Sequence, residues 1–408
     1  MSSTKNRISL ARPKSTKGLG AKKQSPVSTS ILGASQIGLP RPAWIEINLA
    51  QLQRNFELIN RNKRPGLRLL SVIKDQAYGH GALKVAEVAA AAGVDFFALV
   101  TLEEAINLRE TGFRQPLLLL GDRSEEELPL CIRFDLTCCV TEPHSVARLG
   151  QLAERAGKHV QVHLKINTGM NRYGVHWRHA ASLAELVCAT RSLGLEGVMS
   201  HFAQSEEVDK SFALVQLARF EEAVQAMTQR GIAIRLRHLC NSGGFLDLPQ
   251  AHYEMVRLGL LPLGVFPSTS CRSLPGIEPV MTVKARIAAI QHLEPGDSVS
   301  YGMHFRTPSA RRIAVLPIGY ADGFPRVCNQ GAALIHGRRA PLVGVVTMDA
   351  LMVDITDIPA AQLWSEAVLM GRQGTDEISV HEIAGLKNSI SYDVLANWRA
   401  RLPRVYRS

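Results

Sequence analysis

The chain of 408 residues is 46% hydrophobic and 20% charged, with a formal net charge of +11. This length and composition are typical of a globular protein that is large enough for two hydrophobic cores. The apolar stretch 86–100 is interrupted by Asp95, and no other run approaches the length of a membrane-spanning helix. We therefore expect a protein without a membrane segment.

The positive charge is concentrated in residues 1–40, which contain seven lysines and arginines and no acidic residue; the total of +11 less these seven leaves +4 for the rest. No aromatic residue lies among these basic ones, so nucleic-acid binding by base stacking is not supported. The segment is rich in Ser, Lys, Gly and Pro, which predicts a disordered basic tail of unassigned role. It lacks the apolar core of a secretory signal, although an acid-free leader also fits an organelle transit peptide.

The seven cysteines are an odd number, and none of them forms a Cys-x-x-Cys pair. This usage is typical of free thiols in a reducing compartment and not of a disulfide framework or a zinc site. We therefore expect a cytoplasmic protein without a bound metal.

Residues 41–274 alternate short apolar runs with amphipathic helical patterns. The predicted strands are 67–73, 96–100, 116–120, 136–140, 160–166, 195–200, 235–238 and 253–256. The predicted helices are 83–92, 102–111, 145–156, 180–193 and 212–230. Eight strand–helix repeats over about 230 residues predict an α/β barrel, a parallel (β/α)8 barrel of the TIM type. An open doubly wound sheet stays possible, but no Gly-x-Gly-x-x-Gly follows the first strand.

Residues 275–408 have a different pattern of short β-branched runs, which predicts a separate, mostly β domain. β-branched runs bounded by Gly, Pro and Asp lie at 281–290, 298–301, 312–318, 333–336 and 352–355. A final helical pattern covers 391–401.

Distinctive polar residues follow five of the predicted barrel strands, where the active site of such a barrel lies. They are Lys74, the segment 165–172 (Lys-Ile-Asn-Thr-Gly-Met-Asn-Arg), His201, the segment 238–242 (His-Leu-Cys-Asn-Ser) and the segment 257–259 (Arg-Leu-Gly). A lone lysine, histidine or arginine after a strand is more often an ordinary surface or structural residue. Five such coincidences in register indicate a single site.

From residue 43 onwards the chain resembles the alanine racemase family, which are fold-type III pyridoxal-phosphate enzymes. The segments that carry the resemblance are 74–81, 165–174, 200–203, 241–242, 257–259, 299–302, 319–323, 348–349 and 391–392. Their order and spacing span most of the chain. The resemblance implies a homodimeric isomerase that uses pyridoxal 5'-phosphate to interconvert L-alanine and D-alanine for peptidoglycan.

The resemblance also implies a role for each matching residue around the cofactor. Lys74 would form the Schiff base, and His201 would stack on the cofactor ring. Arg257 would face the pyridine nitrogen, where a permanently charged guanidinium weakens the ring as an electron sink and favours reprotonation at Cα. The phosphate would be held by the side chains of Tyr78, Ser242 and Tyr392 and by the backbone N–H groups of Gly259 and Leu260.

Racemisation requires acid–base groups on both faces of the cofactor. The resemblance implies that Lys74 serves one face and that Tyr301 serves the other, in the site of the partner subunit. Tyr320, Met348 and Asp349 would also come from the partner and would line the substrate's entry and pocket. Arg172 would contact the cofactor and substrate, oriented by Lys165, a position that is often carbamylated in this family.

The chain departs from the usual family pattern at several positions. Asp75 and Gln76 replace Ala-Asp beside the lysine, and Asn167 replaces an aspartate. Leu263 stands where tyrosine is usual, Val345 replaces an arginine, and Glu206 replaces the associated aspartate. These changes leave the exact substrate range and rate open.

Three other functions stay as alternatives. A broad-specificity amino-acid racemase is the first, although the retained Lys165 and the missing export signal favour an alanine racemase over the periplasmic broad-range type. A fold-type III decarboxylase shares the barrel and lysine, but it is expected to have acidic and cysteine groups where this chain has Tyr301. A non-enzymatic protein of pyridoxal-phosphate homeostasis resembles the barrel alone, so the β-rich region after residue 275 disfavours it.

Overall fold

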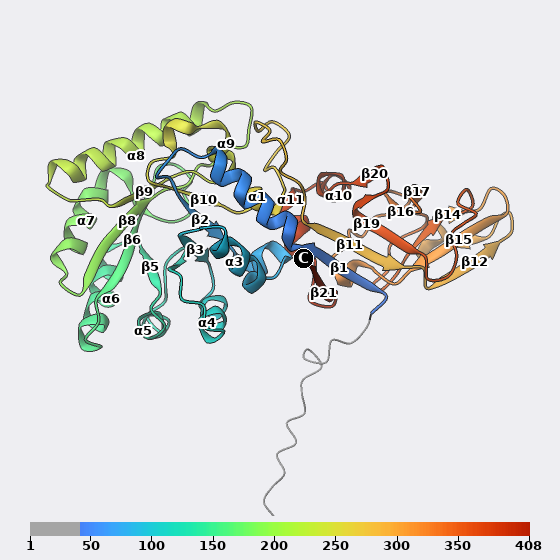
Figure 1. The fold of residues 1–408 in the computed structure, drawn as a ribbon, viewed down its shortest axis with the longest axis horizontal. Coiled ribbons are helices and arrows are strands. Elements are labelled where there is room, and N and C mark those ends of the chain that lie inside the picture. The colour runs from blue at the N-terminus through green and yellow to red at the C-terminus, as the bar shows by residue number, and fades with distance from the viewer. Residues whose placement is uncertain (1–40) are drawn as a thin grey trace, which may run out of the picture. The chain divides into compact units, whose positions relative to one another are not determined.

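The structure is a computed structural model that describes residues 41–408; the predicted tail 1–40 lies outside the described residues. Its first half is a barrel of eight parallel strands in the order β10-β2-β3-β4-β5-β6-β8-β9, with the short β7 (Val175–His176) beside β6 (Figure 1). The strands are β2 (Arg68–Val72), β3 (Phe96–Leu99), β4 (Leu117–Leu119), β5 (Thr137–Val140), β6 (Val160–Asn167), β8 (Leu193–Met199), β9 (Leu236–His238) and β10 (Met255–Leu258). Each overlaps a predicted strand segment, although β6, β8 and β10 extend one or two residues beyond theirs, and the predicted barrel is confirmed.

The barrel is nearly closed between β9 and β10. These two strands do not pair along their length, but the backbone N–H of Arg257 donates to the carbonyl of Cys240 at 3.0 Å. The join therefore lies at the C-terminal ends of the strands, next to the residues that the sequence singled out.

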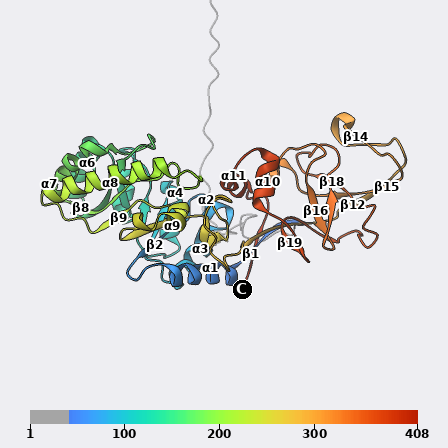
Figure 2. The ribbon, with the colours of Figure 1, turned by 90° about the horizontal axis from the view of Figure 1, so that it is seen from above.

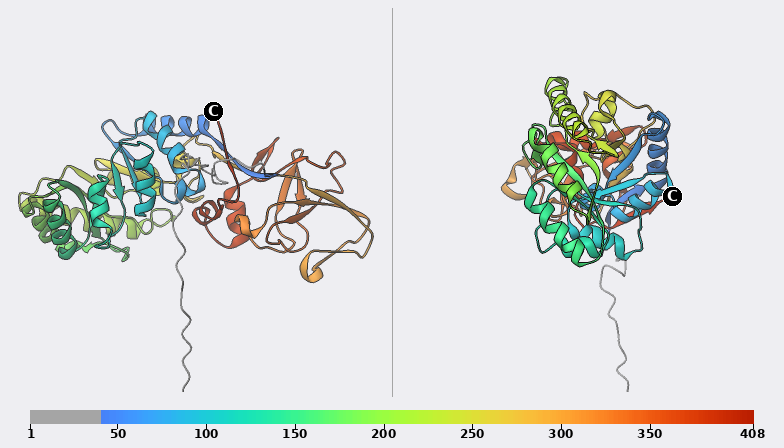
Figure 3. Two further views of the ribbon diagram at one scale, coloured as in Figure 1. Left: turned by 90° about the horizontal axis from the view of Figure 1, so that it is seen from below. Right: turned by 90° about the vertical axis from the view of Figure 1, so that its left-hand side faces the viewer.

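Helices surround the barrel strands, as Figures 2 and 3 show from other sides. They are α1 (Leu49–Asn62), α3 (Ala82–Ala91), α4 (Leu102–Glu110), α5 (Leu128–Arg133), α6 (Pro143–Arg155), α7 (Ala180–Ala189), α8 (Ser211–Gln229) and α9 (Ser242–Asp247). The five predicted helices are among them. The sequence analysis missed α1, α5 and α9; the last two have only six residues each, which is too short for a helical period to stand out.

The second half of the chain is mostly β, as predicted. It contains β11 (Met281–Arg286), β12 (Ala289–Leu293), β13 (Ser298–Val299), β14 (Phe305–Arg306), β15 (Arg311–Leu316), β16 (Ala332–Ile335), β17 (Arg338–Pro341), β18 (Leu351–Asp354), β19 (Glu366–Gln373), β20 (Asp376–Ile378) and β21 (Arg404–Arg407). Two helices, α10 (Val380–Lys387) and α11 (Ser391–Asn397), precede the last strand. The predicted terminal helix 391–401 thus ends four residues early, and the chain continues into β21.

The strand β1 (Ala43–Asn48) differs from the predicted division of the chain. We grouped residues 41–274 in the barrel, but β1 pairs antiparallel with β11 and parallel with β21 in the C-terminal sheet. Its alternating burial, with Ala43, Ile45 and Ile47 inside, fits a sheet with one covered face, whereas the barrel strands are almost wholly apolar and buried. The first strand and the last therefore lie side by side.

Buried Asn55 connects α1 to the segment that leads from the barrel into β11. Its side-chain amide donates to the carbonyls of Pro262 at 3.0 Å and Glu278 at 2.8 Å. Its Oδ1 accepts from Gln51 and from the Glu278 N–H. One fully buried amide thus satisfies backbone groups from two segments more than 200 residues away in sequence.

Replacing this amide should destabilise the join between the two regions. We expect Asn55→Ala to lower the free energy of unfolding by about 2–4 kcal/mol, because two buried carbonyls and one buried N–H lose their partner. Urea denaturation followed by circular dichroism measures this change. Asn62→Ala, which removes one exposed bond within α1, is the matched control and should shift stability by less than about 0.5 kcal/mol. Equal effects of the two variants would contradict the assignment.

Candidate functional site

A cavity of about 530 Å³ lies at the C-terminal ends of the barrel strands. Nine of the residues singled out by the sequence line it: Lys74, Tyr78, Lys165, Arg172, His201, Ser242, Arg257, Gly259 and Tyr392. The one remaining predicted cofactor residue, Leu260, directly follows Gly259; its side chain is fully buried outside the cavity, and the contact predicted for it is through the backbone N–H. Most residues of this site could therefore be found from their position after a predicted strand.

Lys74 begins a single left-handed turn, the segment α2 (Lys74–Gly79). Four successive residues, 75–78, have φ between 51° and 53°. A left-handed turn of non-glycine residues costs about 1–2 kcal/mol per residue, so the surrounding structure must hold it. Nothing in the sequence signals this handedness, because none of the four residues is a glycine.

The C-terminal segment of the chain holds this turn in place. Arg404 donates from Nε to the carbonyl of Gly79 at 3.1 Å. A Cβ on Gly79 would lie 2.6 Å from the carbonyl oxygen of Leu395, and one on Gly81 would overlap the Tyr406 hydroxyl. Glycine is required at both positions because α11 and β21 pack directly against the backbone.

The Lys74 amine lies in an environment that favours its neutral form. Burial lowers its pKa, and the positive charge of Arg172 lowers it further, while Glu104 and Asp75 act in the opposite direction. A neutral amine is the form that attacks a carbonyl carbon. The pocket thus prepares Lys74 for the nucleophilic role that the sequence analysis expected.

Arg257 is a buried cation whose two terminal nitrogens are fully engaged. One donates to the Nδ1 of His238 at 3.1 Å and to the carbonyl of the same residue; the other donates to the Nδ1 of His201 at 2.9 Å and to two carbonyls. Burial lowers the pKa of Arg257 to about 10, which still leaves it charged at neutral pH. All its side-chain hydrogen bonds within residues 41–408 use these two atoms, so Nε is the donor left for a ligand.

The Arg257 contacts extend into a chain of buried histidines. The Nε2 of His238 lies 2.7 Å from the Nδ1 of His163, whose Nε2 lies 3.2 Å from the carboxylate of Glu196. Burial lowers the pKa of His163, His201 and His238, and the charge of Arg257 adds to the effect on each. The rings are therefore neutral at pH 7, and His201 presents an uncharged ring to the cavity. The sequence analysis missed His163 and Glu196, which stand within strands.

One end of the cavity has the donors that a phosphate group requires. The rings of Tyr78 and Tyr392 lie edge to face with centroids 6.1 Å apart, and the Oγ of Ser242 accepts from the Gly259 N–H at 3.2 Å. A Cβ on residue 259 would lie 2.6 Å from the Tyr78 hydroxyl, so only glycine keeps this end open. Three hydroxyls and nearby backbone N–H groups are a suitable set for a phosphate.

A carboxylate also reaches this end of the cavity. The Tyr392 hydroxyl donates to Glu206 at 2.8 Å, and burial together with this carboxylate raises the pKa of Tyr392. A phosphate that accepts from Tyr392 would have to displace Glu206 from the hydroxyl. Because this hydrogen bond must be broken and two negative charges then lie close together, Glu206 weakens anion binding relative to a neutral residue.

The opposite end of the cavity is cationic. Lys165 is buried, and burial together with the charge of Arg257 lowers its pKa to about 7. Arg172 follows the turn that Asn167 forms by accepting from the N–H groups of Gly169 and Asn171 at 3.0 and 3.1 Å. The departure at Asn167 therefore shapes the loop on which Arg172 stands.

Several lining residues were not identified from the sequence. They include Asp122, Arg123 and Ile390, whereas Met170 and Tyr173 stand in the segment 165–174 that the sequence singled out. Asp122 and Arg123 come two and three residues after the predicted strand 116–120, so the strand-end rule would have found them. The Oδ1 of Asp122 is buried and has no partner among the described residues, and burial raises the pKa of this carboxyl.

Four predicted site residues lie elsewhere, on the C-terminal β region: Tyr301, Tyr320, Met348 and Asp349. None of them lines the lysine cavity. Tyr301 is 73% exposed and Met348 is 52% exposed. Tyr301 borders a separate apolar hollow of about 460 Å³, together with Val299 and Met352. The described chain therefore does not bring Tyr301 to its own Lys74.

Both halves of the chain match models of one family. Residues 47–267 match the alanine racemase N-terminal domain, and residues 280–406 match the alanine racemase C-terminal domain. The chain belongs to the alanine racemase family. The resemblance drawn from short motifs is confirmed.

Known members of the family resemble the chain over most of its length. The alanine racemase of Carboxydothermus hydrogenoformans is 39% identical over 368 residues, which cover 90% of this chain and 100% of the relative. That of Syntrophobacter fumaroxidans is 38% identical over 353 residues, covering 86% and 94%. The solved alanine racemase of Clostridium difficile 630 has a TM-score of 0.86 at 32% identity, covering 90% of this chain and 96% of that one.

Three of the positions that depart from the alanine racemase pattern lie in different surroundings. Leu263 and Val345 are buried apolar side chains, at 2% and 8% exposure. Asp75 stands in the left-handed turn, where burial and Glu104 raise the pKa of its carboxyl. No helix in residues 41–408 is long and apolar enough to cross a bilayer.

The buried neutral histidines should make stability fall in mild acid. An unfolded histidine titrates near pH 6.5, whereas burial lowers the pKa of His80 to about 4 and that of His238 well below its usual value. Below pH 6.5 the unfolded chain therefore binds more protons than the folded one. We expect the free energy of unfolding to fall by about 1 kcal/mol per pH unit for each such histidine between pH 6 and pH 5.

Urea denaturation at pH 7.5, 6.0 and 5.0 measures this slope. Exposed His144 supplies the matched control, because His144→Ala should leave the slope unchanged. A free energy of unfolding that stays constant from pH 7.5 to 5.0 would show that these rings are protonated in the folded protein.

Proposed function

We propose that this protein is a pyridoxal-phosphate-dependent racemase that interconverts L-alanine and D-alanine. The observation that carries the proposal is the arrangement of Arg257, whose terminal nitrogens are held by His201, His238 and carbonyls while Nε remains for a ligand beside Lys74. A guanidinium at this place donates a hydrogen bond to a ring nitrogen without giving up its proton. The family membership supports the same activity.

The residues of the cavity fit pyridoxal 5'-phosphate. Lys74, with its lowered pKa, would hold the aldehyde carbon, and Tyr78, Tyr392, Ser242 and the backbone at Gly259 would hold the phosphate. The neutral ring of His201 would lie against the cofactor plane. When bound, the cofactor withdraws electrons from the substrate and makes its Cα proton acidic. Arg172 would orient the substrate carboxylate.

Two proton-transferring groups are required, and the chain supplies them from different regions. Lys74 would serve one face of the substrate, and we propose that Tyr301 of a second subunit serves the other. The separation of Tyr301 from the lysine cavity and its exposure support a homodimer with two composite sites. Tyr320, Met348 and Asp349 would complete the substrate end of the partner's site.

We further propose a cytoplasmic enzyme that supplies D-alanine for peptidoglycan. All seven cysteines are free thiols, and five of them are buried. This usage supports a reducing compartment. A free, deprotonated amine at Lys165, with its pKa near 7, would also be open to carbamylation, which would turn this cation into an anion beside Arg172.

A broader substrate range is the second candidate function. Val345 is apolar and Glu206 extends one methylene further than the usual aspartate, so the charges that guide a small zwitterion differ here. The decarboxylase and homeostasis alternatives share the barrel, but the match to the alanine racemase C-terminal domain over 280–406 disfavours both.

A chiral assay with L-alanine, L-serine, L-lysine and L-arginine tests the activity. We expect D-alanine to form fastest, because five cationic side chains and only two carboxylates line the cavity within residues 41–408, which disfavours a cationic substrate side chain. Lys74→Ala should abolish both racemisation and the visible absorbance of the bound cofactor. Carbon dioxide release without any D-isomer would select the decarboxylase, and equal rates for all four amino acids would select the broad-range racemase.

Mixing two inactive variants tests the composite site. Tyr301→Phe should lower turnover by about 100-fold or more, as expected for loss of a proton-transferring group. In a heterodimer of one Lys74→Ala chain and one Tyr301→Phe chain, one of the two sites regains both groups. If subunits associate at random, about half of the dimers in an equal mixture are such heterodimers, so the mixture should recover about a quarter of the wild-type activity. Dimers formed from either variant alone are the control. Absence of recovery in isolated heterodimers would place both groups in one chain.

A further inference from the structure

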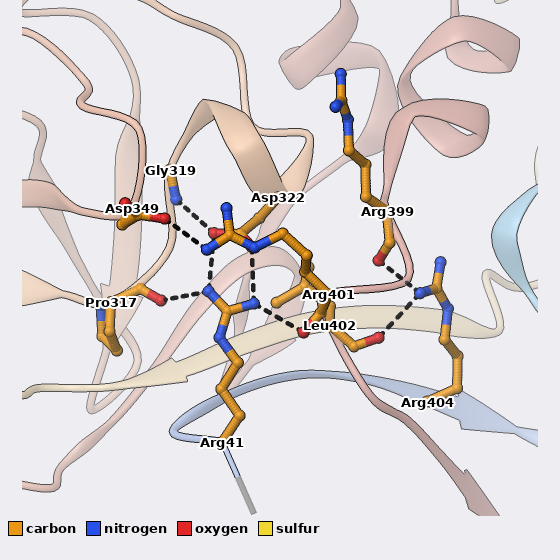
Figure 4. A network of polar contacts seen from close by, with 9 residues as sticks. All are labelled: Arg41, Pro317, Gly319, Asp322, Asp349, Arg399, Arg401, Leu402 and Arg404. Atoms are coloured by element: carbon orange, nitrogen blue, oxygen red, sulfur yellow. Dashed lines mark hydrogen bonds and ion pairs between the residues drawn. The ribbon is translucent and has the colours of Figure 1, made fainter. Parts of the chain in front are cut away.

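Three charged residues, Arg41, Asp349 and Arg401, form a network with buried Asp322, and we call these four residues the Asp322 cluster (Figure 4). Arg41 binds both carboxylate oxygens of Asp322, at 2.7 and 2.9 Å. Arg401 reaches the same carboxylate at 3.5 Å and donates to Asp349 at 2.5 Å. The side chain of Asp322 is fully buried, whereas that of Asp349 is 60% exposed.

The cluster lies under the two loops that carry Tyr320 and Met348. Asp322 accepts from the Gly319 N–H at 3.0 Å, which fixes the start of the first loop. The N–H groups of Tyr320 and Ala321 donate to the carbonyls of Thr347 and Met348 at 3.1 and 3.0 Å. The loops are therefore bonded to each other as well as to the cluster.

The two arginines of this cluster pair with different carboxylates. Arg41 already neutralises Asp322 through a bidentate pair and also binds the carbonyls of Pro317 and Arg401. Arg401 adds only a longer contact to Asp322, and its short contact is with Asp349. Loss of Arg401 would thus leave the buried carboxylate paired and the exposed carboxylate unpaired.

An unpaired carboxylate at residue 349 would matter for an anionic ligand. Asp349 directly follows Met348, and both side chains are exposed, as are those of Tyr320 and Tyr301. Tyr301 and Thr347 border one hollow and the Tyr320 N–H donates to the Thr347 carbonyl, so these residues share one face. In the proposed composite site, this face would meet the carboxylate of the amino-acid substrate. Two carboxylates in a site shielded from water repel each other far more than they do in bulk solvent.

We propose that Arg401 is a positioning residue for the partner subunit's substrate site. It neutralises the Asp349 carboxylate and holds the Met348–Asp349 turn, so that the substrate carboxylate is not repelled. This inference rests on the proposed function, since it requires that the face carrying Met348 serve the partner's site. The residue acts across the dimer although it makes no contact with the lysine cavity of its own chain.

Kinetics of Arg401→Gln test the charge effect. We expect the KM for L-alanine to rise about 5- to 20-fold with kcat changed less than about twofold, as expected for lost ground-state binding of one charge. The dissociation constant of propionate, which has the carboxylate of alanine but cannot react, should rise by a similar factor in calorimetry. The KM increase should shrink in high salt, because salt screens charge repulsion but does not repair a misfolded loop.

Three further variants separate charge from structure. Arg401→Lys keeps the positive charge and should restore most of the propionate affinity. The double variant Arg401→Gln/Asp349→Asn removes the unpaired carboxylate and should do the same. Arg339→Gln breaks an exposed ion pair with Asp376 and Glu382 in the same β region and is the matched control, with unchanged KM. A double variant as weak as Arg401→Gln would overturn the neutralising role.

Purified heterodimers decide which site Arg401 serves. In a Lys74→Ala chain paired with an Arg401→Gln chain, the one competent lysine faces a partner with intact Arg401, so the KM should be normal. In a wild-type chain paired with a Lys74→Ala/Arg401→Gln chain, the competent lysine faces the altered partner, so the KM should be raised. The opposite pattern would show that Arg401 affects the KM of the site in its own chain, which would contradict the proposal.

The two levels of failure are distinguishable. If the Lys74→Ala/Tyr301→Phe heterodimer recovers no activity, the composite site itself is wrong. If it recovers activity while Arg401→Gln leaves the KM and the propionate affinity unchanged, the composite site stands and the role of Arg401 is wrong.

Discussion

The buried guanidinium of Arg257 is the interaction on which the site depends. Arg257 closes the gap between β9 and β10. Its backbone N–H donates to the carbonyl of Cys240 after β9, and its guanidinium donates to carbonyls at the ends of β8 and β9. A buried cation is tolerable only when it is fully hydrogen-bonded. His201 and His238 accept hydrogen bonds from this cation, and burial beside it keeps both rings neutral. Barrel closure and site chemistry are thus set by one residue.

A second constraint comes from the last ten residues of the chain. Arg404 binds the carbonyls of Trp398, Arg399 and Leu402 and also reaches Gly79 in the left-handed turn behind Lys74. Three residues earlier, Arg401 binds Asp349 on the opposite side of this segment. One short stretch therefore supports the lysine of its own barrel and the loops proposed for the partner's site. The parallel pairing of β21 with β1 holds this stretch in register.

Much of the barrel and half of the site could be predicted from the sequence, for physical reasons. Buried parallel strands read as short continuous apolar runs, so all eight were visible. The chemistry of such a barrel lies at strand ends, so Lys74 and Arg257 could be placed together. The pairing of β1 with β11 and β21 joins residues more than 200 positions apart and leaves no local pattern. The left-handed turn at 75–78 has no glycine, and the place of His163 beside Glu196 depends on facing strands.

Charge in the cavity explains why the same pocket can bind an anion and keep amines neutral. Lys74, Lys165, Arg172 and Arg257 all line it, against the carboxylates of Asp122 and Glu206. Crowded cations lower one another's proton affinity, which is the direction seen for both lysines. An anion that enters would offset this crowding and raise both pKa values towards their usual range. The amine of Lys74 is therefore most nucleophilic before the pocket is filled, which suits the carbonyl capture proposed for it. Once an anion is bound, protonation becomes easier, which suits the proposed role of this amine in removing and returning a proton.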